Sequence, residues 1–332
     1  MKFWHLLLAI TIAGSVNVHA QDSINLGNYT VAGTFTLDSL GGVGGAISGL
    51  EASAVTYAPD RGTLFFVGDE GTGVIEISTT GQTLGNNFFD WTGTGSTNHD
   101  TEALTYLGNG VLVVGEERLF DAYRFNYVAG ATVTLANSFV SISNDNVGNN
   151  GMEGLSYDPR GGGSFVAIKQ QSPENILGGT LTFAGGSGGT STMTQLFDPT
   201  LMGLASLSDV QTLSLVGALD GTAAADNLLV LSLASRKLIE VTRAGVVKSM
   251  FDLTNVLPHN AIEGVTIDQN GTIYLVAEQV QDGTAGPNEK SQLIVLTQVP
   301  EPNTWILFII GFAIAGAAIY RRRSGIRYQN VT

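Results

Sequence analysis

The sequence contains no cysteine, so its fold has no disulfide framework and depends on a hydrophobic core. It is also poor in basic residues, because 15 lysines and arginines stand against 29 aspartates and glutamates, for a net charge of −14. Such a surface makes nucleic acid and anionic membranes poor partners. The excess carboxylates either keep the protein soluble or hold a cation.

Familiar catalytic signatures are missing as well. No Gly-x-Ser-x-Gly motif marks a serine nucleophile. Glycine-rich stretches such as 185–189 lack the lysine and following helix of a phosphate-binding loop. No segment between the two ends of the chain has the pattern of a long amphipathic helix, which favours an all-β fold.

The N-terminus is typical of a secretory signal. Lys2 precedes the apolar run Leu6 to Ile12, and Val18-His-Ala20 supplies small residues for signal peptidase. We therefore predict a signal peptide at 1–20, followed by an exported domain at 21–298 and a separate C-terminal tail at 299–332.

The tail has three parts in fixed order: Val299-Pro-Glu-Pro302, the uncharged stretch Trp305 to Tyr320, and Arg321-Arg-Arg323. As a helix the uncharged stretch would extend about 24 Å, slightly short of a hydrocarbon core of about 30 Å. The arginines favour a cytoplasmic end. The order resembles the PEP-CTERM sorting tail, which implies a bacterial protein with a transmembrane helix in the inner membrane, then cleavage by an exosortase. Export to the cell surface or extracellular matrix follows from the resemblance; a plain C-terminal anchor is the alternative.

Five segments roughly fifty residues apart share a polar or acidic residue, a small residue, an aliphatic residue, Ser or Thr, and often Tyr. Each precedes a turn rich in Gly, Asn and Pro and a second apolar run, which indicates a strand, a tight turn and a second strand. The segments open at Ser53, Glu102, Glu153, Gln211 and Glu263.

Third and fourth apolar runs complete most repeats, and four short strands per repeat predict a five-bladed β-propeller of four-stranded blades. The fifth repeat lacks a fourth strand. Tyr29 to Leu37 otherwise belongs to no blade, so we expect it to pair with Ser291 to Thr297 and close the ring.

Three blocks resemble the SdiA-regulated family of bacterial five-bladed propellers: 68–71, 100–118 and 263–278. The resemblance spans roughly residues 29–297. It implies a calcium site in the propeller and a distant kinship with six-bladed calcium-dependent lactonases and esterases, without a settled activity.

The inner strands start, and the second strands end, on one face of a propeller, so acidic residues at these positions should ring the mouth of the channel. Three carboxylates about 6 Å apart would repel by roughly 3 kcal/mol per pair at an effective dielectric near 20. Calcium, the nearby Arg118, Lys169 and Arg236, or water in a wide channel could offset this repulsion. The candidate calcium ligands are Glu102, Glu153, Glu263, Asp69, Glu116 and Glu278.

His99 and His259 lie shortly before Glu102 and Glu263 and are candidate general bases, although they could equally be ordinary loop residues. The sequence therefore leaves two functions open. One is a binding module for an extracellular polysaccharide, a peptide or a small ligand. The other is a calcium-dependent hydrolase of esters, lactones or phosphoesters.

Overall fold

The computed structural model describes residues 21–37, 51–143, 148–171, 173–279 and 290–299, together with Ile314 and Tyr320. The predicted signal peptide lies outside the described residues, as does the predicted tail apart from Val299, Ile314 and Tyr320. Within the described part of the chain, no helix is long and apolar enough to cross a membrane.

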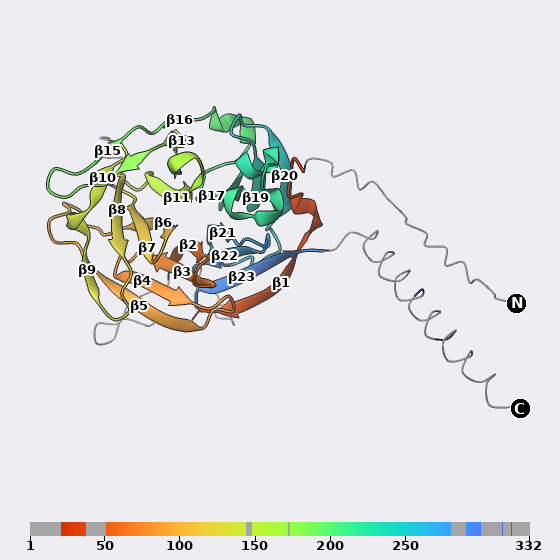
Figure 1. The fold of residues 1–332 in the computed structure, drawn as a ribbon, viewed down its shortest axis with the longest axis horizontal. Coiled ribbons are helices and arrows are strands. Elements are labelled where there is room, and N and C mark those ends of the chain that lie inside the picture. Colours follow the sequence, from red (N-terminus) through yellow and green to blue (C-terminus); the bar gives the residue numbers. More distant parts are fainter. Residues whose placement is uncertain are drawn as a thin grey trace, which may run out of the picture.

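The described residues form a ring of five antiparallel sheets, each with its first strand at the centre (Figure 1). The five-bladed, four-stranded propeller expected from the repeats is thus confirmed. The inner strands are β2 (Ala52–Ala58), β6 (Thr101–Gly108), β11 (Met152–Asp158), β17 (Asp209–Thr212) and β21 (Ile262–Ile267). The second strands are β3 (Thr63–Gly68), β7 (Val111–Glu116), β12 (Ser164–Lys169), β18 (Leu228–Ser232) and β22 (Ile273–Ala277).

The outer half of each blade is more exposed and less regular. The third strands are β4 (Gly73–Ile77), β8 (Asp121–Asn126), β13 (Asn175–Gly179), β19 (Lys237–Val241) and β23 (Gln292–Gln298). The outermost are β5 (Thr83–Asp90), β10 (Phe139–Ser141), β16 (Thr194–Gln195), β20 (Val247–Asp252) and β1 (Tyr29–Thr36). Short additions are β9 (Thr132–Thr134), which runs parallel to β5, and the hairpin β14 (Leu181–Thr182) and β15 (Thr190–Ser191).

Short 3₁₀ helices occupy several connections. They are η1 (Leu26–Asn28), η2 (Leu135–Asn137), η3 (Arg160–Gly162), η4 (Pro199–Met202), η5 (Leu213–Leu215), η6 (Gly217–Leu219) and η7 (Ala223–Asp226).

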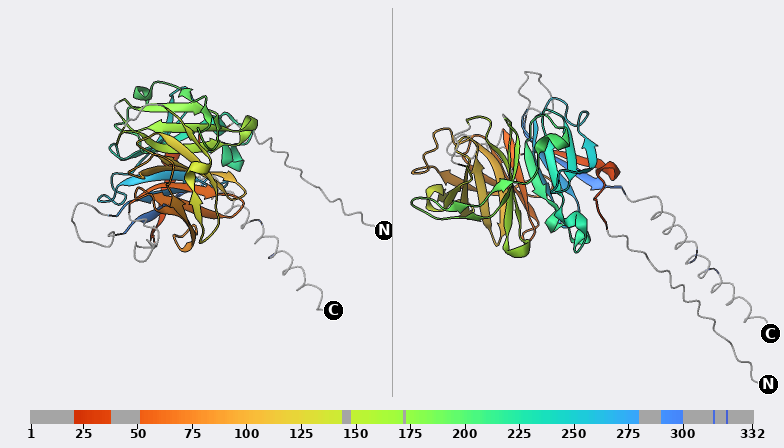
Figure 2. Two further views of the ribbon diagram at one scale, coloured as in Figure 1. Left: turned by 90° about the vertical axis from the view of Figure 1, so that its left-hand side faces the viewer. Right: turned by 90° about the horizontal axis from the view of Figure 1, so that it is seen from above.

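Figure 2 shows the ring from two further directions. The inner strand β2 contacts the inner strands β6 and β21 of the neighbouring blades and is buried along its whole length. Adjacent blades are joined by an inner-strand hydroxyl that accepts a backbone N–H from the next blade, at 2.9 to 3.1 Å. These bonds run from Tyr106 to Thr56, from Tyr157 to Thr105, from Thr212 to Ser156 and from Tyr57 to Thr266.

These bonds correct the expected register of the fourth repeat. Thr212 occupies the place of Tyr106 and Tyr157, so the repeat opens at Ser208, three residues before the expected Gln211. Thr212 to Leu215 resembled the motif in sequence, but after Thr212 the chain leaves the sheet as η5. Asp209 stands where the other repeats have Ala or Gly, which concealed the true register.

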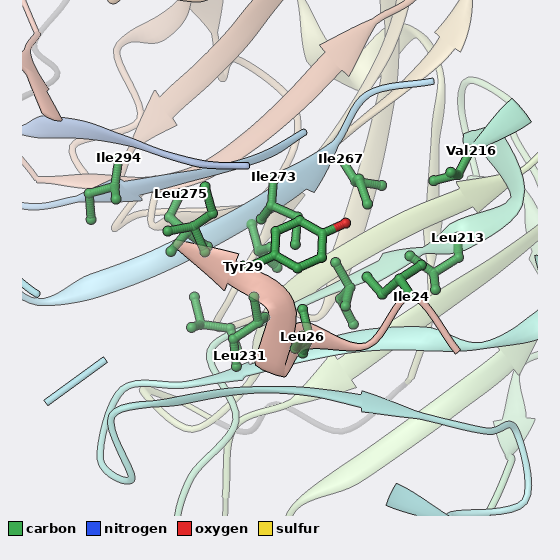
Figure 3. Close-up of a cluster of buried hydrophobic side chains, with 14 of the residues drawn as sticks. Ile24, Leu26, Tyr29, Leu213, Val216, Leu231, Ile267, Ile273, Leu275 and Ile294 are labelled. Atoms are coloured by element: carbon green, nitrogen blue, oxygen red, sulfur yellow. The ribbon is translucent and has the colours of Figure 1, made fainter. Parts of the chain in front are cut away.

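The ring closes as predicted, with β1 antiparallel to β23 from Tyr29 opposite Gln298 to Thr36 opposite Gln292. The preceding residues cross blade 4. Figure 3 shows Ile24, Leu26 and Tyr29 among aliphatic side chains of blades 4 and 5. The Tyr29 hydroxyl donates to the Gly271 carbonyl at 2.9 Å, so the N-terminal segment joins two blades.

Candidate metal site

A β-bulge recurs where the inner strand opens in four of the five blades. The pairing of the inner and second strands shifts at this point, which sets one residue off the hydrogen-bonded ladder. Bulges re-aim side chains at the ends of strands. The bulged residues are Ser53, Glu102, Glu153 and Glu263, so the repeat places three carboxylates at the same end of the channel, here called the carboxylate face.

A second repeated contact brings further acids to this face. In four blades the residue that follows the second strand donates its backbone N–H to the residue two places before the bulged one, at 2.8 to 3.1 Å. These contacts run from Asp69 to Glu51, from Glu117 to Asp100, from Gln170 to Gly151 and from Glu278 to Ala261. Two of them join acidic residues.

Asp69 is shared by two groups of acids that could each hold a metal ion. One group is Glu51, Asp69 and Glu70, and the other is Asp69, Asp100 and Glu102. Within each group, one carboxylate oxygen per residue lies within 4.8 Å of the others. Oδ1 of Asp69 is buried without a hydrogen-bond partner among the described residues. Opposite ligands of Ca²⁺ are about 5 Å apart at bond lengths of 2.3–2.6 Å, so both groups fit this ion.

Burial and neighbouring carboxylates raise the pKa values of two of these acids, Asp69 and Glu102. Burial, followed by the adjacent Glu51 carboxyl, raises the pKa of Asp69 to about 8. Burial and the charges of Glu153 and Glu263 raise the pKa of Glu102 well above its usual range. Both effects disfavour the ionised form, and a bound cation would reverse them.

Four further acids of this face also have raised pKa values. Burial raises the pKa of Glu117 to about 7 and, together with the charge of Glu263, that of Glu278 to about 9. Burial also raises the pKa of Glu263 to about 7, although a hydrogen bond with Glu278 opposes it. The pKa of Glu153 is raised well above its usual range by burial and by the charge of Glu117.

Of the six predicted ligands, Asp69 and Glu102 belong to the two groups. The charges of Glu153 and Glu263 act on Glu102, and those of Glu51 and Glu70 act on Glu278, so these three further predicted ligands interact with the groups electrostatically. Glu116 belongs to neither group, and its carboxylate accepts hydrogen bonds from Ser96 Oγ at 2.8 Å and from the Leu119 N–H at 2.7 Å.

Sequence reasoning did not include Glu51, Glu70 and Asp100, the other members of the two groups, among the candidate ligands. Glu51 and Asp100 each stand two residues before the residue that opens a repeat, in blades 1 and 2. That recurrence was the available signal.

The three basic residues considered as counter-charges differ in their contacts. Arg118 forms an ion pair with Asp100 at 2.7 Å. Arg236 donates to backbone carbonyls, including that of Asn260 at 2.7 Å, and Lys169 donates to the carbonyls of Gln171 and Pro173. Among these contacts, that of Arg118 is the one that involves a carboxylate of the candidate groups.

The two histidines occupy different surroundings. The His99 ring stacks on Trp91, with ring centroids 5.0 Å apart, and lines a pocket of about 600 Å³ together with Glu70. His259 is exposed in the loop before β21. Of the two, His99 lies in the wall of a pocket next to the candidate groups.

Comparison with known families identifies the propeller. The SdiA-regulated family model matches residues 43–280, which is most of the chain. The chain belongs to the SdiA-regulated family. The resemblance of the three sequence blocks is thus confirmed, and this SdiA-regulated protein also matches the PEP-CTERM protein-sorting motif at residues 298–323. The motif implies processing by an exosortase, export and a membrane-anchored precursor.

Solved structures match this chain at low similarity. A Myxococcus xanthus glutaminyl cyclase is 10% identical, with 82% of this chain and 97% of that chain covered and a TM-score of 0.48. A luciferin-regenerating enzyme is 10% identical, with 80% and 95% covered and a TM-score of 0.46. At such low similarity, function has to be argued from the residues of the SdiA-regulated protein itself.

Proposed function

We propose that this protein is an exported binding module of the cell surface or extracellular matrix, stabilised by Ca²⁺ on its carboxylate face. The observation that carries the proposal is the Asp69 carboxylate, which belongs to both acidic groups and has a buried oxygen without a partner among the described residues. Oxygen ligands from Asp and Glu are those that Ca²⁺ prefers. When bound, the ion would add positive charge to that of Arg118, which pairs with Asp100.

Thermal unfolding in calcium chloride and in chelator tests this proposal. An ion that binds only the native state adds about 2.7 kcal/mol at a hundred times its Kd, which corresponds to several degrees in Tm. Asp69→Asn should abolish the difference. Asp220→Asn, an exposed acid outside both groups, should keep it. Equal melting temperatures of the wild type with calcium and with chelator would refute the calcium site.

A calcium-dependent hydrolase is the second candidate, because the 600 Å³ pocket has both Glu70 and His99 in its wall. A cation held by Glu70 would supply Lewis acidity, and His99 would accept the proton of an attacking water. His99 has a φ of 62°, which Asn tolerates, so His99→Asn removes the base with little backbone strain.

Assays against aryl ester, lactone and phosphoester panels, with calcium and with chelator, separate the two candidates. Calcium-dependent turnover that His99→Asn abolishes would establish the hydrolase. A calcium-stabilised protein without turnover on any panel supports the binding module.

A further inference from the structure

A second pocket lies on the opposite face of the propeller, away from the carboxylates. Its volume is about 260 Å³, and it is called here the hairpin-face pocket. The inner strands run from the carboxylate face to this one, so the turns that end them surround the pocket. Its walls include Pro59, Asp60, Tyr106, Asn109, Tyr157 and Leu215.

The pocket forms where the blades depart from their repeat. In blades 1 to 3 the inner strand ends in a short turn and returns directly as the second strand. In blade 4 the chain instead passes through η5, η6 and η7, and the Gly217 N–H donates to the Gln269 carbonyl of blade 5 at 3.0 Å. Leu215, the last residue of η5, lines the pocket. Places where a natural protein departs from its own repeat pattern are often functional sites.

The size and the walls define the ligand that fits. Pockets for drug-sized molecules hold about 300–1,000 Å³, so this one accommodates a single ring. Tyr106, Tyr157 and Leu215 supply aromatic and apolar surface, and no lysine or arginine is among its lining residues. The lining therefore offers an anionic ligand no cationic side chain.

Polar groups stand at the rim and are held in position by the backbone. Asp60 and Asn109 are both exposed, and the Asn109 N–H donates to Asp60 Oδ2 at 3.1 Å across blades 1 and 2. The Tyr106 hydroxyl accepts from the Gly110 N–H at 2.7 Å. Because these contacts hold the Asp60 carboxylate and the Tyr106 hydroxyl before a ligand arrives, these two groups lose little conformational freedom on binding.

We propose that the hairpin-face pocket binds one neutral pyranose unit of a polysaccharide. The C–H face of such a ring matches the aromatic and apolar walls, and its hydroxyls reach Asp60 and Asn109 at the rim. The proposal rests on the binding-module function and gives it a ligand class. It does not depend on calcium, because its residues lie at the far end of the inner strands.

Saturation-transfer NMR with methyl β-D-glucopyranoside and methyl β-D-galactopyranoside tests the site, since millimolar affinity is expected for a single ring in a small pocket. Leu215→Trp fills the pocket and should abolish the transfer. Leu201→Trp, at a leucine that is 59% exposed on η4, is the matched control and should retain it.

Asn109→Gly is a second variant whose folding is secure, because Asn109 has a φ of 53°, which glycine adopts freely. Loss of the amide should weaken sugar binding roughly three- to tenfold. Transfer to p-cresol or choline but to neither sugar would overturn the ligand class. Absence of transfer to every probe, or transfer that survives in Leu215→Trp, would overturn the pocket. Melting temperatures measured on the same samples in calcium and in chelator report on the calcium site separately. Failure of the sugar pocket and failure of the calcium site can therefore be told apart.

Discussion

At the scale of single residues, Gly68 determines where the Glu70 carboxylate lies. A Cβ at this position would stand 2.2 Å from Glu70 Oε2 and 3.1 Å from the Glu51 carbonyl. The closer atom ends a flexible side chain, so Gly68→Ala should displace the carboxylate and leave the blade folded. We expect calcium affinity to fall about tenfold by titration calorimetry.

Gly217→Ala, where the nearest atom would be 3.7 Å away, is the control for this change. Unchanged affinity in Gly68→Ala would show that Glu70 is not a ligand.

Asp209 is a second residue with a distinct role, because its carboxylate accepts backbone hydrogen bonds from both blade 4 and blade 5. Its Oδ2 accepts the Val265 N–H at 2.6 Å and its Oδ1 accepts the Val210 N–H at 2.7 Å. Asp209→Asn replaces one acceptor by a donor that faces an N–H group. We expect a loss of about 1–3 kcal/mol in the free energy of unfolding, measured in urea. A free energy equal to that of the exposed control Asp252→Asn would contradict this role.

At the scale of elements, the segment before β1 is fastened to blade 4 by Glu240 of β19. This side chain is fully buried, and it accepts hydrogen bonds from Ser23 Oγ, the Ile24 N–H, Asn227 Nδ2 and Ser249 Oγ. Glu240→Gln presents an amide N–H₂ to some of these donors and should cost about 2–4 kcal/mol.

The same variant should expose the N-terminal segment to proteases before the blades unfold, since this segment would detach first. Cleavage that starts elsewhere, at the rate of the wild type, would show that β1 alone holds the segment.

The inner strands were predictable because small, aliphatic, hydroxyl-bearing and aromatic residues recur in one order, with turn residues at fixed places. Blade 4 was misread, since Asp209 replaces the small residue and its true register depends on the bond from Thr212 to Ser156, which joins separate blades. Such contacts have no signature along the chain.

The candidate site was predictable to the extent that it repeats. Glu102 and Asp69 occupy positions fixed by strand direction, so sequence placed both on the right face. Glu70 has no repeated counterpart, and its position depends on the backbone beside Gly68. Glu116 occupies a repeated position at the end of a second strand, but its carboxylate accepts hydrogen bonds from Ser96 and Leu119, which the repeat did not indicate.

At the scale of the whole molecule, the two faces differ in their charge balance. On the hairpin face, Glu76 pairs with Arg61 at 2.8 Å and Asp158 pairs with Arg160 at 2.7 Å. On the carboxylate face, Arg118 pairs with Asp100 at 2.7 Å, and burial raises the pKa values of the nearby Asp69 and Glu102. A cation is therefore suited to one face and a neutral ligand to the other.

This imbalance makes the stability of the metal-free protein depend on pH. The pKa of Asp69 is raised to about 8 and that of Glu278 to about 9, whereas unfolded carboxyls titrate near 4. Between these limits the folded state binds more protons than the unfolded state, so stability falls as the pH rises. In chelator, the melting temperature should therefore be higher at pH 5 than at pH 8.

Calcium should reverse part of this trend, because the ion binds the deprotonated carboxylates and releases their protons. The calcium-induced rise in melting temperature should thus grow from pH 5 to pH 8. The double variant Asp69→Asn, Glu278→Gln should weaken the metal-free dependence, since neither replacement titrates in this range, and Glu117 and Glu263 should account for part of the slope that remains. A metal-free melting temperature that increases from pH 5 to pH 8 would show that the charges of this face are already neutralised within the protein.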